Sequence, residues 1–241
     1  MRVKITLSYN GSIFFGFQSQ TSTQNTVATA LQNSFKKIGI TSKLHASGRT
    51  DRNVHATAQV IHIDLPSYWS DFKKLKTHLN VNLSPHIVIR RIEIVNEDFH
   101  ARYSAKSRVY RYILSTSRPD PFRAKFITFV KDFDKSVMRN AMKEFIGKHD
   151  FEWFKKNGSP TSSDVRSIKK TFMYEHNGCT ILYFEADGYL RSQIRMMVYM
   201  LLEVSQNKLP LSAISEQLTK QVRHSTNLAP PNGLYLAKVK Y

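Results

Sequence analysis

The sequence predicts an α+β fold of two lobes, each a largely antiparallel sheet with packed helices. Three observations lead to this prediction. Stretches in which apolar and polar residues alternate, as in strands, are separated by longer stretches with apolar residues at helical spacing. Each half of the chain combines strands with helices. A segment with two prolines, residues 118–123, lies between the halves.

In the first half, Val3, Ile5 and Leu7 alternate with polar residues and predict a strand that ends at the turn Asn10-Gly11. The expected elements after it are a helix at 25–38, strands at 42–46 and 58–63, a helix at 68–79, and strands at 87–95 and 108–115. The polar residues 47–53 then form a loop between two strands.

The proline-containing segment sets the expected domains: an N-terminal lobe at 1–115 and a C-terminal lobe at 116–241, with a cleft between them. In the second lobe we expect a helix at 137–146, a hairpin at 168–187 turning at Asn177-Gly178, a long helix at 190–202 and a closing strand at 233–241.

The chain is strongly basic, with 36 Lys+Arg against 18 Asp+Glu in 241 residues and a formal net charge of +18. Both halves carry the excess: residues 1–115 have 16 basic and 6 acidic side chains, and the remainder has 20 and 12. A folded body with this charge favours a polyanionic partner. The alternative is a basic protein whose charge serves only solubility.

The cysteine count and the apolar runs bear on the compartment. Cys179 is the only cysteine, so an intrachain disulfide and a Cys-based zinc site are excluded and a reducing compartment is expected. The first residues alternate like a strand and do not resemble a signal peptide. The longest apolar run, residues 196–202, is far below the roughly 18 residues of a membrane helix. We therefore expect a soluble, cytoplasmic protein.

An acid stands between two arginines in the loop 47–53. Arg49 and Arg52 flank Asp51, while Gly48 and Asn53 both tolerate a positive φ. Such a loop can direct Asp51 out of a sheet and into a cleft. The alternative is an ordinary turn whose Asp accepts backbone N–H bonds.

Arg191 and Arg195 are spaced i,i+4 in an otherwise apolar helical pattern, so we expect both guanidinium groups on one side of that helix. A guanidinium drawn toward the interior needs a carboxylate or phosphate partner. Alternatively, both arginines extend to solvent along the helix edge.

Residues 99–125 interleave aromatic and basic side chains, a composition that neutralises phosphates and stacks bases. Within this segment, Tyr110 and Tyr112 share one face of a predicted strand and Arg111 lies on the other. The alternative is that both tyrosines belong to the core. The segment holds one acid, Asp120, and seven basic residues: Arg102, Lys106, Arg108, Arg111, Arg118, Arg123 and Lys125.

Nine histidines raise the question of a metal. We consider that His45, His55, His62 and His100 converge on one cleft, but no metal-binding spacing is present and we expect no metal site. The phosphate-binding and dinucleotide-binding glycine motifs are absent from the sequence as well. No cofactor is therefore expected.

Four blocks of the sequence resemble the tRNA pseudouridine synthase A family. Residues 48–55 are similar to its G-R-T-D-x-G-V-H signature, 98–104 and 108–112 to its D-F-H-A-R-F-S block and R-x-Y-x-Y strand, 189–195 to its F-x-R-x-x-x-R helix, and 229–235 to its closing A-P-x-x-G-L-Y segment. Asn53 stands where the family usually has Gly, and Ser192-Gln193 replaces His-Met. Asn is the next-best residue for a left-handed backbone, so the loop geometry is expected to persist.

The resemblance implies isomerisation of uridine to pseudouridine on the 3′ side of the tRNA anticodon stem-loop, at positions 38–40. It implies that Asp51 is the nucleophile or starts elimination and then assists proton removal from C5, and that Arg195 keeps Asp51 ionised. Tyr110 would stack on the flipped uracil, and its hydroxyl would be available for the final deprotonation. Arg49 would occupy the gap left by the extruded base or hold the base out. The basic residues of the 99–125 segment, Arg102, Lys106 and Arg111 among them, would bind the RNA. No cofactor or metal is implied, and the family forms homodimers.

Two other functions stay open at this point. A non-catalytic RNA-binding module would use the same basic surface, but it has no use for an acid that repels phosphate. A metal-dependent nuclease would need two or three acids at ligand spacing, which the loop of Asp51 lacks.

Overall fold

The computed structural model describes residues 1–158 and 161–241, which form two compact units. Unit 1 is Met1–Lys106 with Tyr235–Tyr241, and unit 2 is Ser107–Leu234. The units combine helices with mostly antiparallel sheets, which confirms the predicted α+β class. Their limits differ from the expected lobes 1–115 and 116–241, because residues 108–114 pair with a strand of unit 2 and the last strand returns to unit 1.

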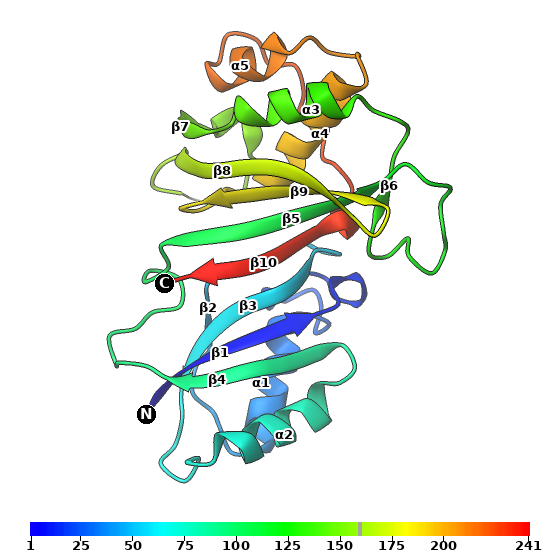
Figure 1. Ribbon diagram of the computed structural model, residues 1–241. Helices are drawn as coiled ribbons and strands as arrows, with labels where there is room; N and C mark the ends of the chain where they lie inside the picture. Colours follow the sequence, from blue (N-terminus) through cyan, green and yellow to red (C-terminus); the bar gives the residue numbers. More distant parts are fainter. Residues whose placement is uncertain (159–160) are drawn as a thin grey trace. The chain divides into compact units, whose positions relative to one another are not determined.

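The sheet of unit 1 has the strand order β4-β1-β3-β10, and a short β2 also pairs with β3 (Figure 1). Antiparallel ladders join β1 to β3 and β4, whereas β10 runs parallel to β3, with Tyr235 opposite His55. Alternate residues of β1, from Val3 to Tyr9, are buried, as the sequence pattern predicts. The strand bounds are β1 Arg2–Tyr9, β2 His45–Ala46, β3 His55–Asp64, β4 Ile87–Ile94 and β10 Leu234–Lys240.

Helices α1 (Val27–Lys37) and α2 (Phe72–Leu83) lie on one face of this sheet (Figure 1). Each begins at a side-chain cap: the Thr26 hydroxyl accepts the Thr29 N–H, and the Asp71 carboxylate accepts two N–H groups of the first turn. The helix expected at 68–79 therefore starts four residues later. The apolar sides of both helices and the inner face of the sheet form the core of unit 1.

The sheet of unit 2 has the order β5-β9-β8-β7, and β6 pairs in parallel with β5. The predicted hairpin is confirmed: β8 and β9 turn at Asn177 and Gly178, whose φ angles are 48° and 70°. The strands β6 and β7 were not expected, since both are short and β6 has only two residues. The strand bounds are β5 Ser107–Ser115, β6 Thr128–Phe129, β7 Gly147–Asp150, β8 Val165–His176 and β9 Cys179–Ala186.

Three helices belong to unit 2: α3 (Lys135–Lys143), α4 (Gln193–Ser205) and α5 (Ser212–Leu218). Helix α4 lies against one face of the sheet and is buried over most of its length (Figure 1). The helix expected at 190–202 begins later, because Ser192 adopts a left-handed φ of 58° that an α-helix excludes. The structure also adds three short 3₁₀ turns, Gly11–Ile13, Glu152–Phe154 and Pro231–Gly233. Across the described residues, every helix is too short or too polar to cross a membrane.

Candidate active site

Asp51 occupies a loop in unit 1 between β2 and β3. The loop turns back on itself, since the Val54 N–H donates to the Asp51 carbonyl at 3.1 Å and Asn53 has a φ of 65°. Asn53 thus adopts the left-handed backbone that was expected of it in place of Gly. The Asp51 side chain is half-buried.

The residues that precede Asp51 in this loop are held by buried polar groups. The Ser47 hydroxyl donates to the Gln59 side chain at 2.7 Å, and the Gln59 amide donates to the Gly48 carbonyl at 3.0 Å. Next to Asp51, the Thr50 hydroxyl bonds to the Tyr9 hydroxyl at 2.8 Å. Since these bonds hold Ser47, Gly48 and Thr50 before Asp51, and β3 begins at His55 after it, the backbone at Asp51 is positioned by the sheet.

A second segment, residues 14–18, packs against the same loop. The Phe17 N–H donates to the Thr50 carbonyl at 3.1 Å, and a Cβ on Gly16 would lie 3.1 Å from that carbonyl oxygen. Gly16 also has a φ of 99°, so both backbone conformation and close approach require glycine there. The Arg49 guanidinium extends over this segment and donates to the Gln18 side chain at 2.5 Å.

His55, which follows the loop, is a buried structural residue. Its Nδ1 accepts the Gly11 N–H at 3.0 Å, and its ring stacks on Tyr235 with the centroids 4.7 Å apart. The other three histidines considered above do gather. The rings of His45, His62 and His100 lie with centroids 4.7 to 5.3 Å apart, so the expected convergence of four is corrected to three.

The histidine cluster is organised by backbone donors. The Ala101 N–H donates to Nδ1 of His62, and the Arg102 N–H to Nδ1 of His100. Burial, followed by the neighbouring His100 and His45, lowers the pKa of His62 to about 4, and burial lowers the pKa of His100 as well. The His62 and His100 rings are thus neutral at pH 7, and His62 holds Ala101 against β3.

In unit 2, Tyr110 and Tyr112 occupy the same face of β5, as predicted, but they differ in their surroundings. Tyr112 is fully buried, and its hydroxyl donates to the Pro230 carbonyl at 2.6 Å and bonds to Thr128 at 2.9 Å. Its assignment to the core is confirmed. Tyr110 is buried as well, at 8% exposed, so both tyrosines belong to the core; its ring makes an edge contact with Tyr189, with the centroids 5.3 Å apart.

Tyr189 stands where the family motif has Phe, and its additional hydroxyl is buried. No partner for this hydroxyl is found among residues 1–158 and 161–241. Burial raises the pKa of Tyr189 well above its ordinary value, so the group stays protonated. The edge contact with Tyr189 thus orients the Tyr110 ring, and it leaves the buried Tyr189 hydroxyl without a hydrogen bond within the described part of the chain.

Arg195 lies in the first turn of α4 and is half-buried. Its Nε donates to the Ala229 carbonyl at 2.8 Å, and the Ala229 N–H donates to the Arg195 carbonyl at 3.0 Å. This reciprocal pair ties the closing segment 229–233 to α4. The segment also reaches β5 and β6, where a Cβ on Gly233 would lie 2.6 Å from the Thr128 hydroxyl. The family's closing block thus holds the elements of unit 2 together.

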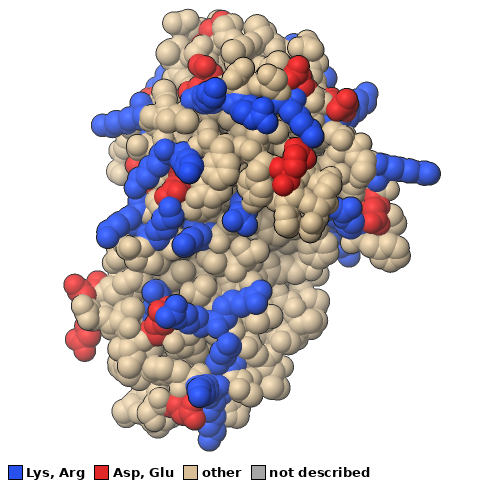
Figure 2. All heavy atoms as spheres, viewed as in Figure 1, with Lys and Arg blue, Asp and Glu red and all other residues tan. Residues whose placement is uncertain are grey.

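Arg191 does not share the helix with Arg195, which corrects the expected i,i+4 pair. The left-handed Ser192 separates the two, and the exposed Arg191 guanidinium donates to the Asn157 carbonyl at 2.9 Å. The other predicted RNA contacts, Arg102, Lys106 and Arg111, are exposed. In the view of Figure 2, Lys and Arg side chains outnumber acidic ones over both units.

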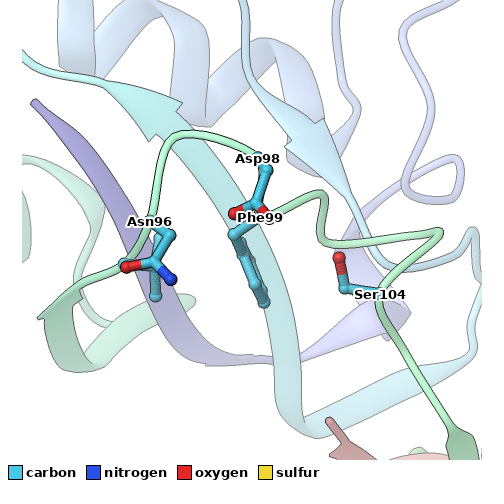
Figure 3. A pocket seen from close by; sticks show the side chains of 5 residues that line it. Asn96, Asp98, Phe99 and Ser104 are labelled. Atoms are coloured by element: carbon cyan, nitrogen blue, oxygen red, sulfur yellow. The ribbon is translucent and has the colours of Figure 1, made fainter.

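An open pocket of about 340 Å³ lies beside the segment that follows β4. Asn96, Asp98, Phe99 and Ser104 line it (Figure 3). Its lining holds one carboxylate and lacks arginine and lysine, so it is poorly suited to phosphate. The predicted catalytic residues are not among its lining residues.

Three carboxylates in unit 2, of Asp150, Glu152 and Asp164, lie close enough together to share a cation. Lysine ammonium groups already pair with these carboxylates. The Lys220 ammonium lies 2.6 Å from both Asp150 and Glu152, and Lys155 pairs with Asp164.

Comparison with known proteins agrees with the four sequence blocks. The tRNA pseudouridine synthase family matches residues 5–104 and 141–241. A protein of Wolinella succinogenes named tRNA pseudouridine synthase A is 41% identical over 98% of this chain and 92% of its own. Proteins of the same name from Helicobacter hepaticus and Campylobacter jejuni are 39% and 36% identical, over 99% and 100% of this chain and 98% and 100% of their own.

Proposed function

Because the chain belongs to the tRNA pseudouridine synthase family and is an isomerase that acts on tRNA, we propose that its targets are uridines 38–40, on the 3′ side of the anticodon stem-loop. The observation that supports catalysis most directly is the loop of Asp51. The carboxylate follows residues that are hydrogen-bonded to the sheet, and it is flanked by two exposed arginines. A surface built only to bind RNA gains nothing from an acid at that position.

The reaction needs little besides a positioned carboxylate. The N1–C1′ bond of uridine breaks, the uracil rotates while held, and a C5–C1′ bond forms; C5 then loses its proton and N1 gains one. Atoms and electrons balance without a redox change or a group donor. We infer that Asp51 either attacks the sugar or starts elimination there, and then assists proton removal from C5.

Arg195 is proposed as the partner of Asp51. Arg195 is half-buried in the first turn of α4. Two hydrogen bonds with Ala229, one from the guanidinium Nε and one to the Arg195 carbonyl, fix its position. A planar guanidinium beside a carboxylate keeps it ionised and oriented. Arg195→Lys should therefore lower the single-turnover rate more than tenfold, because a point charge does not replace the fork.

A double-mutant cycle between Asp51→Asn and Arg195→Lys, read out as tRNA affinity and as free energy of unfolding, measures this pair. A coupling of about 1 kcal/mol or more supports it, and strict additivity refutes it.

Tyr110 and Arg49 are proposed to handle the extruded base. The edge contact with Tyr189 fixes the Tyr110 ring, which suits it to stack on uracil. Arg49, exposed beside Asp51, would fill the space that the base leaves in the RNA. Arg102, Lys106 and Arg111 would bind the backbone phosphates.

We also propose that the protein is a cytoplasmic homodimer that needs no cofactor. The proposal of a homodimer rests on the family resemblance. Light scattering on the purified protein measures the oligomeric state, and a monomer at micromolar concentration would contradict this part of the proposal.

Incubation of the purified protein with unmodified tRNA transcripts, followed by position-resolved mapping of pseudouridine, tests the proposed targets. Conversion confined to 38–40 supports them, and conversion elsewhere refutes the site. Binding without any conversion would favour the alternative, a structured-RNA-binding module.

A further inference from the structure

An aromatic ring and a guanidinium are stacked at the surface beside the Asp51 loop. The Arg52 guanidinium lies over the Phe15 ring, 4.2 Å from its centroid. Phe15 is 42% exposed although it is a large apolar side chain, and Arg52 is exposed as well. Among the described residues, Arg52 forms no salt bridge, so its plane is held by the ring and not by an acid.

The backbone under this pair is fixed. The Phe15 N–H donates to the Asn25 carbonyl at 2.9 Å, and the Phe15 carbonyl accepts the Gln20 side-chain amide at 2.8 Å. The next residues of the segment are joined to the loop by the Phe17-to-Thr50 hydrogen bond. Phe15 is thus presented by a rigid segment rather than by a loose loop tip.

The place of the pair, at the loop of Asp51, favours an RNA base as its ligand. Residues 10–26 contain no charged side chain, so the nearby charges in the sequence are those of the loop itself: Arg49, Asp51 and Arg52. Arg52 directly follows Asp51, and consecutive Cα atoms are about 3.8 Å apart. A nucleotide next to one that reaches Asp51 would therefore meet the guanidinium plane of Arg52.

We propose that Phe15 and Arg52 form a stacking platform for one unpaired tRNA base next to the target uridine, with the guanidinium between the ring and the base. The inference rests on the proposed function, since it takes the target uridine to be at Asp51. Bases stack on aromatic rings and on guanidinium planes in single-stranded RNA recognition. The platform binds the neighbour and takes no part in bond making or breaking.

The test uses an anticodon stem-loop RNA with 2-aminopurine beside the target uridine and two substitutions of the platform. Phe15→Leu keeps apolar volume and removes the ring, and Arg52→Lys keeps the charge and removes the plane. We expect each to weaken RNA binding by about fivefold to hundredfold and to reduce the quenching of 2-aminopurine fluorescence. The single-turnover rate at saturating RNA should stay within about threefold of the wild type.

Arg223→Lys is the matched control, because Arg223 is exposed and lies over the Trp153 ring at 5.9 Å, outside the proposed site. It should leave binding and quenching unchanged, and the melting temperature shows that each variant is folded. The double variant Phe15→Leu/Arg52→Lys should lose little more than either single one, since the two side chains act as a unit.

Wild-type affinity and quenching in both platform variants would overturn the proposal. So would a large rate loss at saturating RNA with binding intact, because it would place the pair in the chemistry. The proposed function fails separately, if the wild-type protein forms no pseudouridine while RNA binding still depends on Phe15 and Arg52.

Discussion

At the scale of single residues, the site depends on polar side chains that are held by hydrogen bonds to the surrounding fold. Thr50 is bonded to Tyr9, and Arg195 to Ala229, while Asn53 provides the one left-handed residue that the Asp51 loop requires. The shape of the Asp51 loop therefore depends on Thr50 and Asn53 and not on the Asp51 carboxylate. Substitutions at the reacting atoms should consequently change rate with little change in stability.

Asp51→Asn is the sharpest case. The amide preserves the volume of the side chain, and the loop is anchored by Ser47, Gln59 and Thr50, so the fold should persist. We expect the single-turnover rate of pseudouridine formation to fall more than about a thousandfold, because the nucleophile or base is lost. The tRNA dissociation constant should change by less than about threefold. A rate within tenfold of wild type would assign the catalytic role to another residue.

Tyr189 allows a prediction about stability. Its buried hydroxyl has no partner among the described residues, and such a group costs on the order of 1 kcal/mol or more. Tyr189→Phe keeps the ring contact with Tyr110 and should raise the melting temperature by roughly 2–4 °C.

Tyr112→Phe is the control for this stability prediction. It removes a hydroxyl that bonds to Pro230 and Thr128, and it should lower the melting temperature. Calorimetry on the two variants separates these cases, and a lower melting temperature for Tyr189→Phe would mean that its hydroxyl is satisfied.

At the scale of elements, periodicity predicted most helices and strands, because apolar alternation directly reflects which face of a strand is buried. The errors have identifiable causes. The strand expected at 42–46 shrinks to His45–Ala46, and Ser192 adopts a left-handed φ that no propensity scale favours. The parallel pairing of β10 with β3 joins residues about 180 positions apart, and the packing of Phe15 against Arg52 joins two loops. Contacts of this kind leave no periodic signal in the sequence.

The segment after β4 should respond to pH through His62. This ring is 3% exposed, and burial with His100 and His45 lowers its pKa to about 4, against about 6.5 in an unfolded chain. Between these values the unfolded state binds a proton that the native state does not, so stability falls as the pH falls. The loss from His62 between pH 7.5 and pH 5 should be about 2 kcal/mol.

Urea unfolding at pH 7.5 and pH 5 measures this pH effect. His62→Asn keeps an oxygen acceptor for the Ala101 N–H and removes the titration, so its unfolding free energy should depend less on pH over this interval. An unchanged pH dependence would mean that other groups cause the loss.

At the scale of the whole molecule, the net charge of +18 is the property that the sequence states most directly. Lys and Arg side chains are present over both units, so neither unit alone accounts for the attraction to RNA (Figure 2). Positive charge on both folded units is expected to raise the rate and affinity of RNA binding, but it does not select the target uridine. Selection of the target uridine must then come from base stacking and from the shape of the site.

Binding of tRNA should therefore weaken steeply with salt. Each neutralised phosphate adds roughly 0.7 to 0.9 to the slope of log K against log salt, so about five contacts give a slope near −4. Lys106→Gln or Arg111→Gln should each reduce this slope by about one unit and leave the rate at saturating tRNA nearly unchanged.

Lys208→Gln is the control, because the Lys208 ammonium is already paired with Glu203 at 3.0 Å and its loss releases few additional counterions. Affinity that is insensitive to salt would show that stacking at Tyr110 and at the Phe15–Arg52 platform, and not the basic surface, carries the binding of tRNA.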